Sequence, residues 1–168
     1  MPKLTPNQLE AAINRHMELA TSEALHARCD ELAKLQRVMF MELVSFARDG
    51  ATDEQITEII GFLSIMQYLA EDYSQEMAKP VKMSEFRESA KRAMFWFKTI
   101  DTEDPDDMEQ MLKNWLYGME HHSEPVIWAW VVNLLKNHNI LTCPLNTAIV
   151  VTIYAVADVF SRRIANLE

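Results

Sequence analysis

The chain has 168 residues, a formal net charge of −9 and a hydrophobic share of 49%. This length suits one domain, and this apolar share excludes an intrinsically disordered chain. The negative charge argues against a protein that coats nucleic acid nonspecifically, because binding to phosphates requires a basic surface.

Proline and capping residues mark the expected helix starts in chain order. Thr5 precedes Pro6, and the stretch 52–55 ("TDEQ") reads as a capping box. Between the starts, apolar residues recur at steps of three, four or seven, which is helical spacing. The sequence therefore predicts an all-α, compact bundle of about six or seven helices in a single domain spanning 1–168. The expected helices are 6–20, 22–48, 53–78, 85–99, 105–120, 124–138 and 144–166.

The stretch 6–48 leaves open whether it forms one helix or two. Its second part carries an apolar stripe that includes Leu32, Met39 and Leu43, and Gly50 is expected to end it. Only 3 glycines occur in the chain, so tight hairpin turns are few and helices are favoured over strands.

The last expected helix is rich in β-branched residues, which favour strands. Its apolar run is too long for one strand and does not alternate, so a central helix or a subunit interface is predicted. Asn146, Thr147 and Thr152 interrupt this run and Asp158 ends it, which excludes a membrane span. Because 124–135 is also apolar on most faces, self-association is one hypothesis and mutual burial of the two helices is the other.

Two cysteines, Cys29 and Cys143, form no disulfide framework and no Cys-x-x-Cys motif. This usage predicts a reduced, cytoplasmic protein. The first ten residues contain no long apolar run, so no secretory signal is expected. No pattern in the chain requires a cofactor, and none is predicted.

Histidines and glutamates give two candidate metal sites. Glu23 and His26 form one Glu-x-x-His pair, but a di-iron bundle needs two such pairs and the sequence has no second one. The other candidate is a cluster at a helix junction, formed by Glu120, His121, His122 and Glu124. Adjacent helical residues point about 100° apart, so both histidines could face one ion only across a turn. A polar corner between two helices is the preferred explanation of the cluster, and no metal site is predicted.

Local motifs of catalysis are missing. The sequence has no G-x-S-x-G, no P-loop and no G-x-G-x-x-G motif. With glycines only at 50, 61 and 118, a loop that cradles phosphate is hard to build. We therefore expect a protein without its own catalysis. An enzyme would have to assemble its site from residues far apart in the chain.

A basic segment precedes an acidic one. Between Lys79 and Lys98, six basic residues stand against two acidic ones, and aromatic residues occur near the end of this segment. Basic residues mixed with aromatic ones can hold single-stranded nucleic acid. The candidate contacts are Arg87, Lys91, Arg92 and Lys98. A solvated polar face over an apolar one explains the same pattern, so binding to nucleic acid is kept only as an alternative.

The acidic stretch from Asp101 to Glu109 is the strongest charge feature of the chain. Its six acids are Asp101, Glu103, Asp104, Asp106, Asp107 and Glu109. Asp104 caps a helix that begins at Pro105, and acids in a first turn stabilise a helix by about 0.3–1 kcal/mol each. Asp101 and Glu103 exceed that need. They either pair with neighbouring basic residues or form a strip that a basic surface of another protein grips.

These observations favour a non-enzymatic protein-binding module, an adaptor, regulator or inhibitor whose partner is another protein with a basic surface. The contact candidates are the acidic stretch and three tryptophans, because tryptophan is enriched at binding hot spots: Trp115, Trp128 and Trp130. Small acidic helical inhibitors from phages and mobile elements, which block nucleic-acid-handling enzymes, share this physical description; the analogy is one of type. A nucleic-acid-binding regulator and a metal-dependent helical enzyme are the alternatives, and no membrane contact is predicted.

Overall fold

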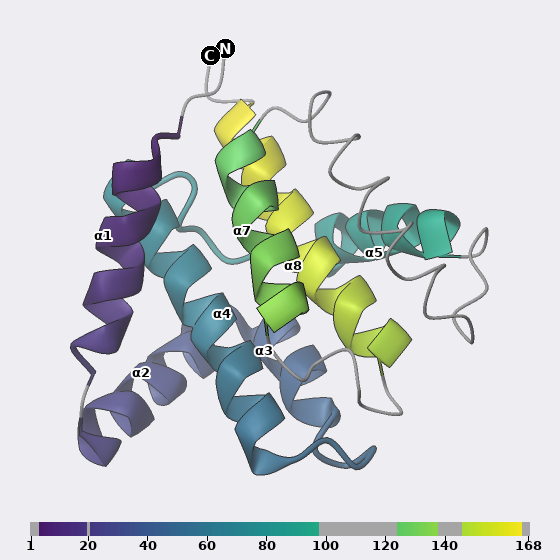
Figure 1. The fold of residues 1–168 in the computed structure, drawn as a ribbon, viewed down its shortest axis with the longest axis horizontal. Coiled ribbons are helices and arrows are strands. Elements are labelled where there is room, and N and C mark those ends of the chain that lie inside the picture. The colour runs from purple at the N-terminus through teal and green to yellow at the C-terminus, as the bar shows by residue number, and fades with distance from the viewer. Residues whose placement is uncertain (1–3, 20, 98–123, 138–145, 166–168) are drawn as a thin grey trace.

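The computed structural model describes residues 4–19, 21–97, 124–137 and 146–165. All regular elements in these ranges are helices, which confirms the predicted all-α fold (Figure 1). The helices are α1 (Pro6–Met17), α2 (Ser22–Leu35), α3 (Arg37–Ser45), α4 (Asp53–Tyr73), α5 (Met83–Phe97), α7 (Pro125–Asn137) and α8 (Asn146–Ala165). The helix predicted at 105–120 lies outside the described residues.

Capping side chains fix the starts of α1 and α4 where the sequence predicts them. The Thr5 hydroxyl accepts a hydrogen bond from the Gln8 backbone N–H, and Gln8 Oε1 accepts one from the Thr5 N–H at 2.8 Å. Thr52 and Gln55 repeat this reciprocal pair at 3.2 Å and 2.9 Å. Each box satisfies two main-chain donors that a helix start otherwise leaves unbonded.

The single helix predicted at 22–48 is wrong, because the chain leaves helical geometry at Gln36 and divides into α2 and α3. Gln36 has φ −114° and ψ 45°. Its amide nitrogen donates to Gln67 Oε1 at 2.8 Å and to the Lys79 carbonyl at 3.1 Å, while its oxygen accepts from the Val81 N–H at 2.9 Å. These three hydrogen bonds lie within the fold and offset the broken helix. Together with the separation of α1 from α2, they divide the first 45 residues into three helices.

The ends of α3 and α4 differ from the predicted ends. Gly50 has φ 98°, and the Ala51 N–H donates to the Phe46 carbonyl at 3.0 Å, which is the hydrogen bond of a Schellman motif. Gly50 closes the turn after α3, but α3 itself ends at Ser45, before the predicted end at residue 48. The prediction that the next helix reaches residue 78 is wrong, because Ser74 is extended and its hydroxyl accepts from the Met77 N–H at 3.2 Å. That bond starts a separate turn.

The core lies around α4 and α8, and the other helices pack against this pair (Figure 1). All residues of α8 from Ile149 to Ser161 are buried, as are those of α4 from Gly61 to Ala70. The prediction that the last helix is central is therefore confirmed. None of the described helices is long and apolar enough to cross a membrane.

A buried carboxylate joins α5 to α8. Asp158 is 6% exposed, and its Oδ2 accepts from the Ser89 hydroxyl at 2.7 Å and from Arg92 Nε at 3.1 Å. Arg162 Nε lies 3.2 Å from the same oxygen, and Arg92 also pairs with Glu88 at 3.0 Å. Arg92 therefore contributes to the packing of α5 on α8.

Candidate functional site

Helices α1 and α7 begin side by side and then diverge (Figure 1). Each has proline as its first residue, Pro6 in α1 and Pro125 in α7. Just before them, the Leu4 backbone N–H donates to Glu124 Oε2 at 3.0 Å, so the two starts are tied together. Glu124 is fully buried, and this bond gives it a structural role.

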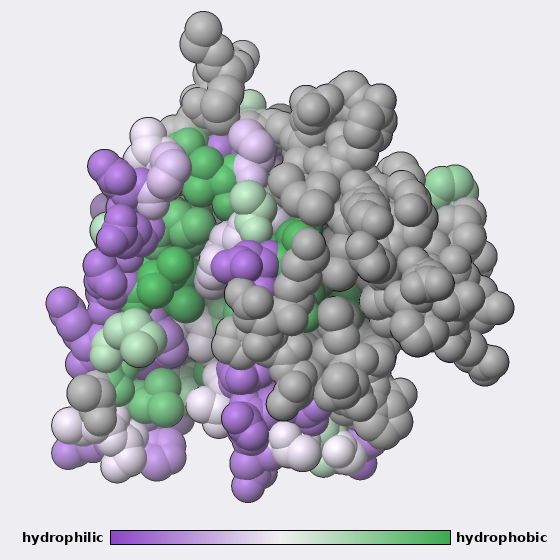
Figure 2. Space-filling model, viewed as in Figure 1, coloured by the Kyte–Doolittle hydropathy of each residue, from purple (hydrophilic) through white to green (hydrophobic). Residues whose placement is uncertain are grey.

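The divergence of the two helices leaves an apolar groove, which we call the α1/α7 groove. Its volume is about 570 Å³. It is lined by Pro6, Leu9, Glu10, Ile13, Pro125, Val126, Ala129, Trp130 and Asn133. Figure 2 shows apolar surface along α1 where it faces α7, with hydrophilic residues on the outer side of α1. Most of the lining is apolar, so the groove favours side chains over water.

Trp130 is the largest side chain in the groove. Its ring stacks on Phe62 of α4, with ring centroids 5.1 Å apart and planes inclined by 25°. Phe62 is 2% exposed and Trp130 is only half-buried, so a fixed core ring supports a ring that still reaches the surface. Trp130 is also one of the three tryptophans that the sequence offered as contact candidates.

The other two predicted tryptophans differ. Trp128 is 2% exposed and packs against Tyr154, with ring centroids 4.7 Å apart. It belongs to the core and offers no surface to a partner, which corrects its prediction as a contact residue. Trp115 and the acidic stretch from Asp101 to Glu109 lie outside the described residues.

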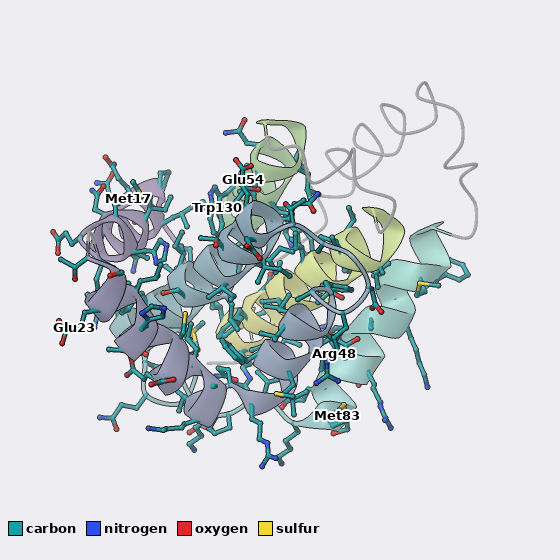
Figure 3. All side chains as sticks on the ribbon, turned by 90° about the horizontal axis from the view of Figure 1, so that it is seen from below. Met17, Glu23, Arg48, Glu54, Met83 and Trp130 are labelled. Atoms are coloured by element: carbon teal, nitrogen blue, oxygen red, sulfur yellow. The ribbon has the colours of Figure 1, made fainter. Side chains whose placement is uncertain are left out.

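The remaining sequence candidates are not brought together. Arg87 and Lys91 are exposed on α5, and Glu23 and His26 are exposed on α2, where Glu23 points outward (Figure 3). The candidates outside the described residues are Lys98, Glu120, His121 and His122. In the described part of the chain, no group of three or more His, Cys, Asp or Glu side chains could hold a metal ion.

A polar cluster that the sequence did not reveal joins α1, α2 and α4. His16 Nδ1 lies 3.2 Å from the Ser64 hydroxyl, and Arg28 Nε donates to the same hydroxyl at 3.2 Å. Gly61 makes this approach feasible, because a Cβ at that position would lie 3.1 Å from His16 Nε2. Arg28 also pairs with Glu71 at 3.4 Å. All these residues lie on helices, and only the fold brings them together.

A serine beside a histidine can act as a catalytic nucleophile, so Ser64 and His16 were considered for this role. Ser64 is only 1% exposed, so a substrate atom has no room about 3 Å from its oxygen. Its hydroxyl already accepts from Arg28, which makes the pair part of the packing between helices. Cys29 is no better placed as a nucleophile, because burial, followed by the charge of Asp30, raises the pKa of its thiol.

A second cavity of about 650 Å³ lies where the turn before α5 meets the end of α8. Arg163 dominates it, but its guanidinium donates to the Met77 carbonyl at 3.0 Å and to the Lys79 carbonyl. It also pairs with Glu85 at 3.1 Å. The cationic group thus holds the turn against α8, and the cavity is a weaker candidate for ligand binding than the α1/α7 groove.

No protein-family model matches the chain, and neither the curated proteins nor the solved structures include one with significant similarity to it. The α1/α7 groove is therefore interpreted from its own residues.

The His16 cluster predicts a stability that depends on pH. Burial, followed by the charge of Arg28, lowers the pKa of His16 below its ordinary 6.5. The unfolded chain then binds a proton near pH 6.5 more readily than the folded chain, so the free energy of unfolding should fall as pH drops through and below 6.5. Glu71 faces the cluster from α4 and Arg15 from α1, where Arg15 pairs with Glu71 at 3.6 Å.

The measurement is urea unfolding at pH 7.5, 6.5 and 5.5 for the wild type and His16→Gln. Glutamine retains a hydrogen-bonding group but does not titrate, so its stability should vary less over this range. The lowered pKa of Glu85 affects stability only at lower pH, below its ordinary 4.5. Equal slopes for the two proteins would show that His16 does not control this pH dependence.

Proposed function

We propose that the protein is a non-enzymatic protein-binding module, an adaptor, regulator or inhibitor, and that it binds its partner in the α1/α7 groove. The observation that carries this proposal is the apolar lining around Trp130, whose ring is supported by Phe62. A few aromatic residues held in pockets supply most of the binding energy of many interfaces.

The charge of the chain supports a basic partner. The net charge is −9, and opposite charge on a partner raises the rate of association and excludes like-charged competitors. In this proposal the acidic stretch from Asp101 to Glu109 adds an electrostatic contact to the apolar one. That part rests on the sequence alone, and it predicts that salt weakens binding.

The test compares two alanines that are both exposed on helices. Ala129 lines the groove on α7, whereas Ala27 lies on α2 outside it. Tagged wild type, Ala129→Glu and Ala27→Glu serve as baits in extracts of the native cell, with retained proteins quantified by mass spectrometry. We expect a protein that the wild type and Ala27→Glu retain equally and that Ala129→Glu retains at least about tenfold less, because a charge is placed in an apolar contact.

Calorimetric Kd values for the identified protein should show the same difference. Circular dichroism checks that both variants fold, since surface substitutions of this kind change stability by only about 0.5 kcal/mol. A partner that binds all three proteins equally would place the contact elsewhere on the molecule. The absence of any retained partner would remove the proposal.

A further inference from the structure

We infer that the occupant of the α1/α7 groove is an amphipathic helix of the partner protein, carrying a lysine or arginine opposite Glu10. This inference rests on the proposed function and specifies the chemistry of the partner. Three properties of the groove support it: the spacing of its lining residues, the kind of backbone in its walls and its charge.

The lining residues follow the helix axes. On α1 they run from Pro6 to Ile13, and on α7 from Pro125 to Asn133, in steps of three or four residues. Such steps place side chains on one face of a helix. At a rise of 1.5 Å per residue, each wall is about 10–12 Å long, which is about two helical turns. The groove is therefore long enough for two turns of a third helix lying along α1 and α7.

The walls suit a helix better than an extended peptide. Both walls are helices, whose main-chain groups bond within the helix, so neither presents the open edge that an added strand would pair with. An extended segment would bring its own N–H and C=O groups against apolar side chains and leave them unbonded, at about 1–3 kcal/mol each. A helix satisfies its main chain internally and presents only side chains.

The charge of the groove favours a basic residue beside the apolar face of the bound helix. Glu10 is exposed, and of the described residues that line the groove it is the one with a formal charge. A basic side chain beside the apolar face of the incoming helix would reach it. The net charge of −9 favours such a partner over an acidic one.

A second copy of this chain is a poorer occupant. Its exposed large apolar residues in the described helices are Met17 on α1, Met41 on α3, and Met83, Met94 and Phe95 on α5. Only α5 offers more than one, and Met83 and Met94 are about 16 Å apart along its axis, which exceeds the length of the groove. Met83 and Met17 also lie on opposite sides of the molecule (Figure 3). These residues give no described helix a two-turn apolar face that matches the groove.

The experiment is a selection from a phage-displayed library of random 16-residue peptides, with the full-length protein as bait and Ala129→Glu as counter-bait. We expect enriched sequences with apolar residues at i, i+3 or i+4, and i+7, flanked by lysine or arginine and lacking internal proline. Synthetic copies should gain helical circular dichroism on binding. Proline-rich or non-helical binders, or no binder that requires the groove, would overturn the inference.

A charge exchange tests the pairing with Glu10. Glu10→Lys should weaken the best lysine-bearing peptide about tenfold, and changing that lysine to glutamate should restore the loss on the variant. Glu18→Lys, at the C-cap of the same helix but outside the groove, should leave affinity unchanged. Equal effects of the two substitutions would overturn the pairing.

This result is separable from that of the cell-extract experiment. A partner that needs Ala129 intact but binds through a non-helical segment contradicts only the inference that the bound segment is a helix. A dimer of the wild type that Ala129→Glu dissolves, seen by sedimentation, contradicts the choice of a separate partner protein. A partner that binds Ala129→Glu as tightly as the wild type contradicts the proposal that the groove is the binding site.

Discussion

Replacement of Arg28 by alanine is expected to lower the free energy of unfolding by about 2–3 kcal/mol, because it removes a buried guanidinium whose hydrogen bonds join α2 to α4. The Arg28 side chain is 3% exposed and pairs with Glu31 at 2.6 Å. Its guanidinium lies 3.7 Å from the centroid of the Tyr68 ring. Without it, Glu71 and the Ser64 hydroxyl lose a partner and a cavity forms where three helices meet.

Urea unfolding at pH 7.5 measures the loss, with Arg87→Ala as the control. Arg87 is exposed on α5, so its removal should change stability by no more than about 0.5 kcal/mol. Arg28→Lys should recover only part of the loss, because an ammonium keeps the charge but not the planar stacking on Tyr68. An Arg28→Ala protein within about 1 kcal/mol of the wild type would show that the network contributes little.

The same variant has a second readout. The charge of Arg28 is one of the two causes that lower the pKa of His16, after burial. Removal of that charge should therefore raise the pKa of His16, measured by NMR titration of the ring protons. A pKa of His16 that does not change would show that the charge of Arg28 does not act on the imidazole.

Local features of the fold could be predicted and tertiary ones could not. The boxes at Thr5 and Thr52 depend on residues three positions apart, so the sequence contains the whole interaction. The break at Gln36 depends on Gln67 and on the turn that ends at Val81, 31 to 45 residues away. Nothing in the helical spacing around Gln36 indicates that its side chain serves as a bridge.

The candidate site was predictable in part. Trp128 and Trp130 are two positions apart on α7, and such residues point about 200° apart, so only one of them can face outward. Helix α7 is apolar on most faces, and its sequence therefore does not show which tryptophan that is. The position of α1 decides it, because Leu9 and Ile13 supply the opposite wall. The polar cluster of His16, Ser64 and Arg28 gave no sequence signal, since each residue is ordinary in a helix.

Substitution of Phe62 is expected to reduce both the stability of the protein and its affinity for the partner. It is 2% exposed and supports Trp130, so Phe62→Ala is expected to cost about 3–5 kcal/mol of unfolding free energy and to leave Trp130 without its stacking partner. Affinity for the groove-dependent partner should drop at least about tenfold. Phe62→Leu fills most of the volume and should cost no more than about 1.5 kcal/mol.

Trp130→Ala provides the contrast, because its ring is only partly buried. It should cost less stability than Phe62→Ala and yet lose at least as much affinity, since Trp130 is the side chain that the partner would touch. Urea unfolding and calorimetry on both variants give the two quantities independently. If Trp130→Ala were the more destabilising change, or if its affinity were intact, Trp130 would be a core residue and the groove would lose its central contact.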